Sequence, residues 1–527
     1  MWKPPSKGFP AEGGVLRARR VLSLVPGLQG DAIWWEGGCV RGVGKAAPID
    51  REAPKHLPRL EYPDALVTPG FVDGHTHFAM WALARRRVRL TGAGSLTEAV
   101  ARVAAGAPSQ GWVVGHGWDA NRWTDPPDRH ALDRVHASPV YLDSLDVHAA
   151  WVNSAALAVA RVTRDTPDPP GGRIVRDGAG EPTGILLERA VELVARAVPA
   201  PSTEILDEAL REAQMQAHRL GLTGIHDVED ARAWDAFRRL EEAGDLRLRV
   251  LFHPPVASLP DLIRRGQRSG TGSRWLGMGG VKLFLDGSLG SRTAWMLRPY
   301  EGSRDRGMPV TARRDAARAM RAAAHNGIAV TVHAIGDAAV RQALDLLEGL
   351  PRAAVPHRIE HLQCVHPDDL ARAARAGIVA SMQPAHLLTD IPLVDLLWGD
   401  RGRGAYAFRS LLGRGTTLVF GSDVPVASID PREGVHAAME RKASGGPSGA
   451  TWRAAERLGF ETVVRAYTRA AARASGTGHR LGRLAPGAEA DLVAWAVDPA
   501  VERGEGEAFR TGAAVLTVVG GRVVMRR

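Results

Sequence analysis

The sequence predicts an α/β protein organised around a (β/α)8 barrel. A small composite β-sandwich domain built from both ends of the chain and an insertion lobe after the first barrel strand complete the predicted fold. Three observations predict it. Short apolar runs typical of buried strands alternate with helical stretches through the middle of the chain. Polar residues recur where these runs end, and both ends of the 527-residue chain carry short strands with glycine turns.

The alternation is clearest in the second half of the chain. A helical segment at 316–326 ends at Gly327, and the strand-like run 328–333 follows it. A later helix at 367–376 ends at Gly377, directly before the next strand-like run. Counted in this way, eight strands lie near residues 66–77, 138–146, 222–228, 280–286, 328–333, 357–361, 378–383 and 416–423. Eight parallel strands with crossover helices are the number that closes a barrel.

The two ends of the chain predict a second domain. We expect residues 1–69 and 480–527 to form one composite β-sandwich, because both carry short apolar runs with glycine pairs at their turns. Residues 70–479 would then form the catalytic barrel. The interval from about 78 to 220 is longer than two β/α units, so we expect an insertion lobe over the barrel mouth there.

Composition limits the classes of protein that fit. The chain is 45% apolar and 24% charged, has two cysteines, and contains no run of 18 apolar residues. Its first residues lack the apolar core of a signal peptide, so we expect a soluble, cytoplasmic protein with no membrane partner. The net charge is +10, but the arginines are dispersed along helical segments, so we expect a small-molecule substrate and no nucleic acid.

One lysine stands apart from the other basic residues. Only six of the 68 basic residues are lysines, and Lys282 is the only one between residues 56 and 441. It lies in an apolar run that predicts a buried strand. A lysine amine can be made neutral and nucleophilic, whereas arginine keeps its proton. Three uses remain open from the residue alone: a carbamate that bridges two metal ions, a Schiff base, or a buried ion pair.

Polar side chains follow five of the predicted strands. In a (β/α)8 barrel the carboxyl ends of the strands meet at the face where catalysis takes place. Imidazole and carboxylate are the ligands that divalent first-row metals take. In chain order the strand-end residues are His75 and His77, Lys282, His333, His361 and Asp423. Each residue alone has a structural interpretation, but the five positions together predict a metal site.

The chain here resembles the metal-dependent amidohydrolase superfamily, and within it the amidohydrolase-3 group of YtcJ-like and N-substituted formamide deformylase-like proteins. The similarity extends over essentially the whole length. It rests on residues 67–77 (VTPGFVDGHTH), 146–154 (DVHAAWVNS), 180–184 (GEPTG), 286–292 (DGSLGSR), 333–337 (HAIGD), 358–361 (RIEH) and 421–425 (GSDVP).

The resemblance implies a binuclear centre that hydrolyses an amide, N-formyl or N-acyl C–N bond through a metal-activated water. His75, His77 and Asp423 would hold one divalent ion, which we expect to be zinc. The second ion would be held by His333 and His361, and carbamylated Lys282 would bridge the two. Asp423 would also be the general base and acid. Family members are often dimeric, so the resemblance allows a homodimer while the oligomeric state stays open.

Three alternatives remain open. Some relatives bridge their metals with another residue, and Glu188 is the substitute in this chain; otherwise it would be a carboxylate on a helix surface. A mononuclear deaminase or an isomerase uses the same scaffold, although deaminase-type relatives have a glutamate where this chain has Gly336. A non-catalytic binding protein with this fold is the third alternative.

Several further residues have two interpretations each. His148 would donate to the developing oxyanion or only pack, and Arg292 would clamp a substrate carboxylate or stabilise its loop. Asp227 is expected to orient His226. A group of aromatic and polar residues in the insertion would wall a pocket or form the core of the lobe, and we favour the core: Trp112, Trp118 and Trp123, with His116 and Asp119.

Overall fold

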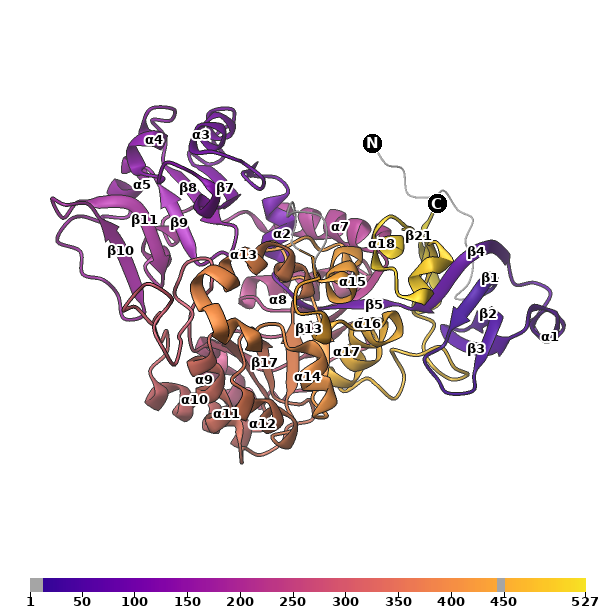
Figure 1. Ribbon diagram of the computed structural model, residues 1–527. Coiled ribbons are helices and arrows are strands. Elements are labelled where there is room, and N and C mark those ends of the chain that lie inside the picture. The colour runs from indigo at the N-terminus through magenta and orange to yellow at the C-terminus, as the bar shows by residue number, and fades with distance from the viewer. Residues whose placement is uncertain (1–12, 443–450) are drawn as a thin grey trace.

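Parallel strands covered by helices form the central part of the molecule (Figure 1). The computed structural model describes residues 13–442 and 451–527. Two sheets lie in this part, with the strand orders β14-β13-β12-β5 and β15-β16-β17-β18-β19, and all their pairings are parallel. Their strands are β5 (Phe71–Thr76), β12 (Leu222–Asp227), β13 (Arg249–Phe252), β14 (Leu276–Met278), β15 (Val281–Phe284), β16 (Val330–Ala334), β17 (Arg358–His361), β18 (Val379–Met382) and β19 (Thr417–Phe420).

The two parallel sheets approach each other at both edges. Isolated parallel bridges join Thr76 to Val424 at one junction and Pro255 to Lys282 at the other. The α/β class is therefore confirmed. A single closed sheet of eight strands is not, because the structure assigns two separate sheets.

One of the eight predicted strands was placed in the wrong sheet. The run near 138–146 forms β8 (Val140–Ser144), which belongs to the insertion lobe. The strand that follows β12 in the central part is instead β13, which the sequence count missed. Both are short apolar runs, and runs of this length look alike whichever sheet buries them. Their assignment depended on contacts distant in sequence.

The insertion lobe contains a sheet of its own, at the upper left of Figure 1. Its strand order is β10-β11-β9-β8-β7-β6, and helices α3 to α6 pack beside it. Trp118, Trp123 and Trp151 are mutually 6.0–6.4 Å apart between ring centroids in its core, and Trp112 is buried in a second apolar cluster, as expected. The remaining elements are β6 (Val88–Arg89), β7 (Val113–Trp118), β9 (Ala149–Val152), β10 (Gly172–Arg176), β11 (Pro182–Glu188), α3 (Leu96–Ala104), α4 (Arg129–Asp133), α5 (Ser154–Val159) and α6 (Val191–Ala195).

Strands from both ends of the chain share one seven-stranded sheet, at the right of Figure 1. Its order is β22-β21-β20-β4-β1-β2-β3, and β4 and β20 pair antiparallel where the two ends meet. The structure assigns a single sheet here, and the predicted domain division stays a prediction, with residues 1–12 outside the described part. The elements are β1 (Gly14–Leu22), β2 (Gln29–Glu36), β3 (Cys39–Gly44), α1 (Ala46–Glu52), β4 (Arg59–Pro69), β20 (Leu492–Ala496), β21 (Ala513–Val519) and β22 (Arg522–Arg526).

Helices cover the outer faces of the central strands. The helix predicted at 316–326 is α10, and Gly327 after it has φ 70°, the left-handed conformation that ends helices. The helices of this part are α2 (Phe78–Ala84), α7 (Thr203–Arg219), α8 (Ala231–Glu242), α9 (Leu259–Arg264), α10 (Arg313–His325), α11 (Asp337–Leu347), α12 (Leu370–Arg375), α13 (Leu387–Trp398), α14 (Phe408–Gly413), α15 (Pro431–Glu440), α16 (Phe460–Tyr467), α17 (Arg469–Ala474) and α18 (Gly506–Arg510).

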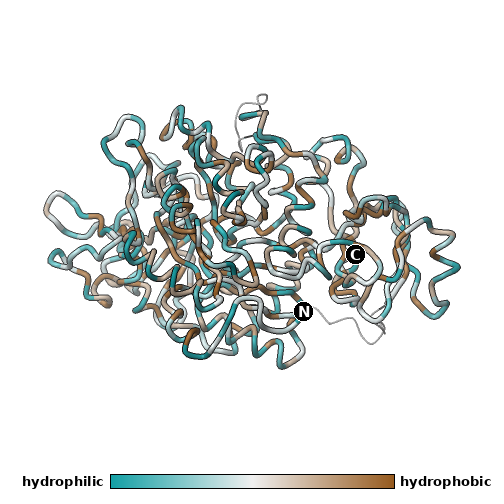
Figure 2. Tube along the Cα trace, turned by 90° about the horizontal axis from the view of Figure 1, so that it is seen from below, coloured by the Kyte–Doolittle hydropathy of each residue, from teal (hydrophilic) through white to brown (hydrophobic). Residues whose placement is uncertain are grey.

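Apolar side chains concentrate inside the central part. Figure 2 shows hydrophobic segments running through its middle and hydrophilic ones at its outer turns. The largest buried cluster joins the strands to the helices around them. Within the described ranges, no helix combines the length and the apolar character that crossing a membrane requires.

Candidate metal centre

Three of the predicted ligands converge at the junction of β5 and β19. His75 lies near the end of β5, His77 directly follows it, and Asp423 follows β19. The Nε2 atoms of both histidines lie 3.2 Å from Asp423 Oδ1. The three ligand atoms all lie within 4.8 Å of one another.

The other nitrogen of each of these two imidazoles already has a hydrogen-bond acceptor. His75 Nδ1 donates to the Glu360 carboxylate, and His77 Nδ1 donates to the Val228 carbonyl oxygen at 2.7 Å. Since carboxylate and carbonyl oxygens only accept, Nδ1 carries the proton in the neutral ring and Nε2 carries a lone pair.

Two Nε2 lone pairs therefore meet a carboxylate oxygen. Burial raises the pKa of Asp423, but the positive charge of a protonated His75 lowers it well below its usual range. Burial and Lys282 lower the pKa of His75, but Glu360 and Asp423 raise it overall, so the cluster favours an ionised carboxylate beside a positive charge. His75 Nε2 and Asp423 Oδ1 are buried and have no hydrogen-bond partner among the described residues. With neutral rings, the two nitrogen lone pairs and the carboxylate oxygen would fit a metal cation in place of that positive charge, and nitrogen and oxygen donors are those that zinc takes.

His333 and His361 lie beside these three residues. The His361 ring centroid is 5.1 Å from that of His75 and 4.5 Å from that of His333. His361 Nδ1 donates to Gln383 Oε1 at 2.8 Å, and His333 Nε2 donates to the Gly287 carbonyl oxygen at 3.1 Å. Each ring keeps one free lone pair. Burial lowers the pKa of both well below the usual value, so both are neutral ligands.

Lys282 lies in the same buried cluster. Its side chain is 3% exposed, and its Nζ lies 4.7 Å from the centroid of the Phe284 ring. Burial lowers its pKa to about 8, and its charge in turn acts on His75 and His361. A substantial fraction of the amine is thus neutral near physiological pH, as carbamate formation requires.

Two ligand-bearing positions have backbone conformations that are uncommon for residues other than glycine. His361 has φ 70° and Asp423 has φ 61°. Each comes where a strand ends, and the left-handed turn there directs the chain away from the sheet. Such conformations persist where surrounding contacts fix them, and they cluster at functional sites.

His148 reaches the cluster from the insertion lobe. Its ring centroid is 5.3 Å from that of His333, and its Nδ1 lies 2.8 Å from Glu188 Oε2. Thr293 donates to the other oxygen of Glu188 at 2.6 Å. Burial alone would lower the pKa of His148, but Glu188 raises it to about 9. Glu188 thus contacts His148 and Thr293, and it lies outside the group of ligand atoms around Asp423.

The structure places Arg292 away from the other site residues, and it corrects the expected pairing of Asp227 with His226. Arg292 is exposed and lies outside the cavity over the cluster, so the structure does not bring it to the other site residues. Its φ of 55° belongs to the turn of its own loop. Asp227 does not orient His226. It accepts hydrogen bonds from Thr76 and from the Phe78 backbone, whereas His226 accepts from Arg358 at 2.9 Å.

Three further residues of the site were not predicted from the sequence. His386, three residues after Gln383, has its Nε2 3.9 Å from Asp423 Oδ2 and donates to the Ser422 carbonyl oxygen at 3.2 Å. Glu360 and Gln383 orient His75 and His361. Gln383 and His386 follow the end of β18. A search for polar residues directly after that strand would therefore have found them.

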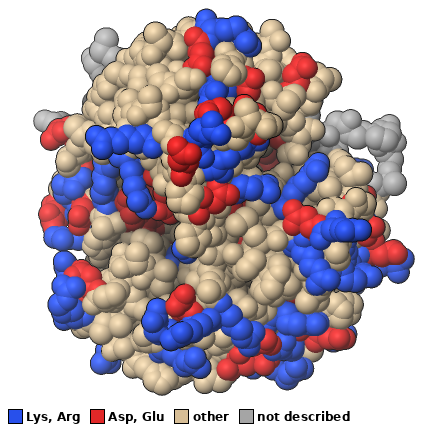
Figure 3. Space-filling view, turned by 90° about the vertical axis from the view of Figure 1, so that its left-hand side faces the viewer, with Lys and Arg blue, Asp and Glu red and all other residues tan. Residues whose placement is uncertain are grey.

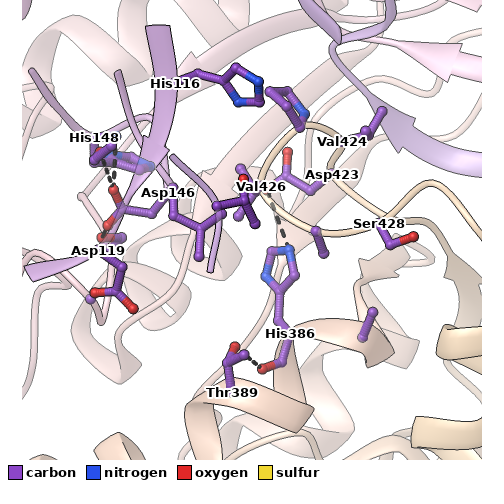
Figure 4. A pocket seen from close by; sticks show the side chains of 18 of the residues that line it. His116, Asp119, Asp146, His148, His386, Thr389, Asp423, Val424, Val426 and Ser428 are labelled. Carbon is purple, nitrogen blue, oxygen red and sulfur yellow. Dashed lines mark hydrogen bonds and ion pairs between the residues drawn. The ribbon is translucent and has the colours of Figure 1, made fainter. Parts of the chain in front are cut away.

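A cavity of about 1270 Å³ opens over the cluster. His333, His361 and Asp423 line its floor, and His148 and Asp146 line it from the lobe. Figure 4 shows His148 and Asp146 on one side of this space, with His386 and Asp423 across from them. The cavity is large enough for a small molecule that contacts both the strand ends and the lobe.

An α/β fold with buried imidazole and carboxylate ligands at its strand ends is typical of metal-dependent hydrolases. The structure is similar to an uncharacterized metal-dependent hydrolase from Pyrococcus horikoshii OT3, with a TM-score of 0.76 and 26% identity over 94% of this chain and 99% of that chain. A second such hydrolase, from Pyrococcus furiosus, has a TM-score of 0.74 and 27% identity over 92% and 99% of the two chains.

The chain belongs to the amidohydrolase family, whose model matches residues 64–525. It is 32% identical to the putative amidohydrolase YtcJ of Bacillus subtilis, over 90% of this chain and 92% of that protein. It is 27% identical to the N-substituted formamide deformylase of Arthrobacter pascens, over 89% and 90% of the two chains.

Proposed function

We propose that this protein hydrolyses a C–N bond of a small molecule, of the amide, N-formyl or N-acyl type, with two divalent ions at the cluster. The observation that carries the proposal is the convergence of His75 Nε2, His77 Nε2 and Asp423 Oδ1, of which His75 Nε2 and Asp423 Oδ1 are buried without a hydrogen-bond partner among the described residues. Family membership and a deformylase relative support it.

The proposed ligands divide into two sets. His75, His77 and Asp423 would hold one ion, His333 Nδ1 and His361 Nε2 the other, and Lys282 as a carbamate would bridge them. When bound, such a pair of ions, which we expect to be zinc, activates a water molecule and polarises the scissile carbonyl.

The protein's own groups would supply the proton transfers. Asp423 lines the cavity, so Oδ2 would accept the proton of the attacking water and return it to the leaving nitrogen. His148 Nδ1 is held by Glu188, so Nε2 is the atom presented to the substrate. There His148 would donate to the carbonyl oxygen as it gains negative charge.

We also infer that the two parallel sheets are the two arcs of a (β/α)8 barrel. β14 and β15 are separated only by Gly279 and Gly280, so together they count as one interrupted strand. With β5, β12, β13 and β16 to β19 this gives eight. The bridges Thr76–Val424 and Pro255–Lys282 support closure at both junctions.

A substrate panel tests the proposed chemistry. Zinc-loaded protein would be assayed with N-formyl amines, N-acyl amino acids, cyclic imides and carbamates. We expect equimolar release of the amine and of formate or another carboxylate from at least one class. Ammonia release from aminated heterocycles alone would instead identify a deaminase, and failure of metal-loaded protein on every class would contradict the proposal.

A further inference from the structure

Three arginines line the cavity where the chain passes from α2 into the insertion lobe. They are Arg85, Arg87 and Arg89, and none of them belongs to the cluster described above. The residue between the first two, Arg86, lies outside the cavity lining and forms ion pairs with Glu208 at 3.2 Å and Glu212 at 2.9 Å on α7. Arg86 is thus paired outside the cavity, whereas Arg85 and Arg87 on either side of it border the cavity without an ion pair to any described residue.

These three arginines form no ion pair within the described part of the chain, in contrast to Arg432, which also lines the cavity and pairs with Asp430. Among the described residues, none of their guanidinium groups makes an ion pair or a side-chain hydrogen bond. Arg85 lies over the Trp81 ring at 5.1 Å, and Arg87 is half-buried, so burial lowers its pKa. On the outer face of the lobe side, by contrast, basic side chains are interspersed with acidic ones (Figure 3).

The polar groups that the structure describes beside these arginines leave the hydrogen-bond donors of the guanidinium groups unpaired. Asp143 acts on Arg87 electrostatically, but its carboxylate accepts a hydrogen bond from the Tyr141 hydroxyl at 2.7 Å and forms no ion pair. His116 pairs in register with Arg89 across β6 and β7. Its pKa is lowered to about 4 by burial and by Arg87 and Arg89, so it stays neutral.

Most carboxylates elsewhere in the cavity wall already accept hydrogen bonds from the protein. Asp146 accepts from Ser288 at 2.6 Å and from Ser291 at 2.9 Å. Asp390 accepts from the Tyr406 hydroxyl at 2.6 Å. None of these carboxylates forms an ion pair with the three arginines, so the guanidinium donors remain available to a molecule inside the cavity.

We propose that Arg85, Arg87 and Arg89 form an oxyanion-binding subsite, which selects substrates that carry a carboxylate or phosphate at the end remote from the bond cleaved. The inference rests on the proposed function, because that function places the scissile bond at the metal cluster. A guanidinium fork matches both kinds of oxyanion with paired hydrogen bonds. The cavity joins the two places, since the arginines and the ligands His333, His361 and Asp423 line the same space.

Matched substrates test the subsite. The probes are N-formyl-ε-aminocaproate, the corresponding (formylamino)hexyl phosphate, and the neutral methyl amide of the first compound. Kinetic constants would be measured for each probe. Equilibrium binding would be monitored by the quenching of tryptophan fluorescence, because Trp81 and Trp118 line the cavity. We expect at least one anionic probe to bind about tenfold or more tighter than the amide, the scale of one charge-assisted hydrogen bond.

Two variants locate the effect. Arg87→Met is expected to remove the preference for the anion, so that KM and the dissociation constant of the anionic probes rise to the values of the neutral amide. Arg86→Met, which loses the pairs with α7, is expected to leave the preference intact. Comparison of the carboxylate probe with the phosphate probe shows which oxyanion the subsite prefers.

Three outcomes are decisive. Equal binding of the amide and both anions, or equal effects of Arg86→Met and Arg87→Met, would overturn the subsite. Anion binding that depends on Arg87 without cleavage of any probe would support the subsite while the proposed reaction fails. Cleavage of the probes without a preference for the anions would support the proposed reaction and contradict the subsite.

Discussion

At the residue scale, each of the four imidazoles of the cluster donates a hydrogen bond from one ring nitrogen to an acceptor that orients the ring. The acceptors are Glu360 for His75, the Val228 carbonyl for His77, the Gly287 carbonyl for His333 and Gln383 for His361. These contacts fix which ring nitrogen carries the lone pair, and such partners tune metal affinity as strongly as many direct ligands do.

Removal of one acceptor should weaken the site without removing a ligand. In Gln383→Leu, His361 loses the partner that fixes its ring, so we expect metal affinity to fall about 10–100-fold. Competition with a chromogenic chelator measures the affinity. Gln267→Leu, at an exposed position on the surface, is the control. Unchanged affinity in Gln383→Leu would show that the ring orientation is set by other contacts.

Glu188 provides a second test at this scale, because its alternative role was that of a bridging ligand. As a partner of His148 it should affect turnover alone. We expect Glu188→Ala to lower kcat by about 100-fold or more, the scale of losing one oxyanion donor, with metal content unchanged. Glu188→Gln keeps an acceptor for His148 Nδ1 but loses the charge that raises the His148 pKa, so it should recover little of the rate at neutral pH and more of it at lower pH. Loss of metal in Glu188→Ala would return Glu188 to the ligand set.

At the element scale, the strand that carries Lys282 is interrupted by two glycines. A Cβ at Gly279 would lie 2.6 Å from the His253 ring, and a Cβ at Gly280 would lie 2.8 Å from the Ala329 carbonyl oxygen. The close approach of neighbouring strands therefore requires glycine at this break. The break separates β14 from β15 and places Lys282 against Pro255 at the junction of the two sheets.

A methyl group at the break should destabilise the fold. We expect Gly279→Ala to lower the free energy of unfolding by about 1–3 kcal/mol, since His253 is buried and cannot move freely. Urea denaturation followed by circular dichroism measures the change. Gly178→Ala is the control, because no atom lies within 4 Å of its added Cβ, and it should stay within about 0.5 kcal/mol. Equal stability of the two variants would show that the break tolerates a side chain.

The sequence predicted the helices and strands more reliably than it predicted which strands pair with each other. The helix of 316–326 and its glycine stop were found within a few residues, because amphipathic spacing and Gly327 are local signals. β13 was missed and β8 was misplaced, because which sheet buries a short apolar run is decided by pairing with strands far away in the chain. The expectation that site residues follow the carboxyl ends of the strands pointed to Asp423 and the histidines. It could not predict that Glu188 from the lobe would accept a hydrogen bond from His148, or that Arg292 would face solvent.

At the scale of the whole molecule, buried polar contacts tie the terminal sheet to the central part. Arg249 on β13 donates to Asp491 Oδ1 at 2.8 Å, and the Gly520 backbone donates to the same oxygen at 2.7 Å. Both ionic side chains are buried. Loss of one partner leaves the other charge without compensation in a medium of low polarity.

Breaking this pair should therefore cost more than breaking a surface pair. We expect Arg249→Met to destabilise the protein by about 3–5 kcal/mol and to lower its thermal midpoint. In Arg211→Met, an exposed 2.9 Å pair with Asp245 is lost, and the cost should be about 1 kcal/mol or less. Calorimetry of the two variants compares them. If their thermal midpoints were lowered equally, the buried pair would not hold the two parts together.

The most direct measurement is the metal content of the purified protein by inductively coupled plasma mass spectrometry, with Lys282→Ala analysed in parallel. Converging lone pairs and a buried amine predict about two divalent ions per chain in the native protein, and fewer ions together with slower turnover in the variant. A native protein that retains no metal even after incubation with zinc, or a Lys282→Ala variant with full loading and native turnover, would contradict the account.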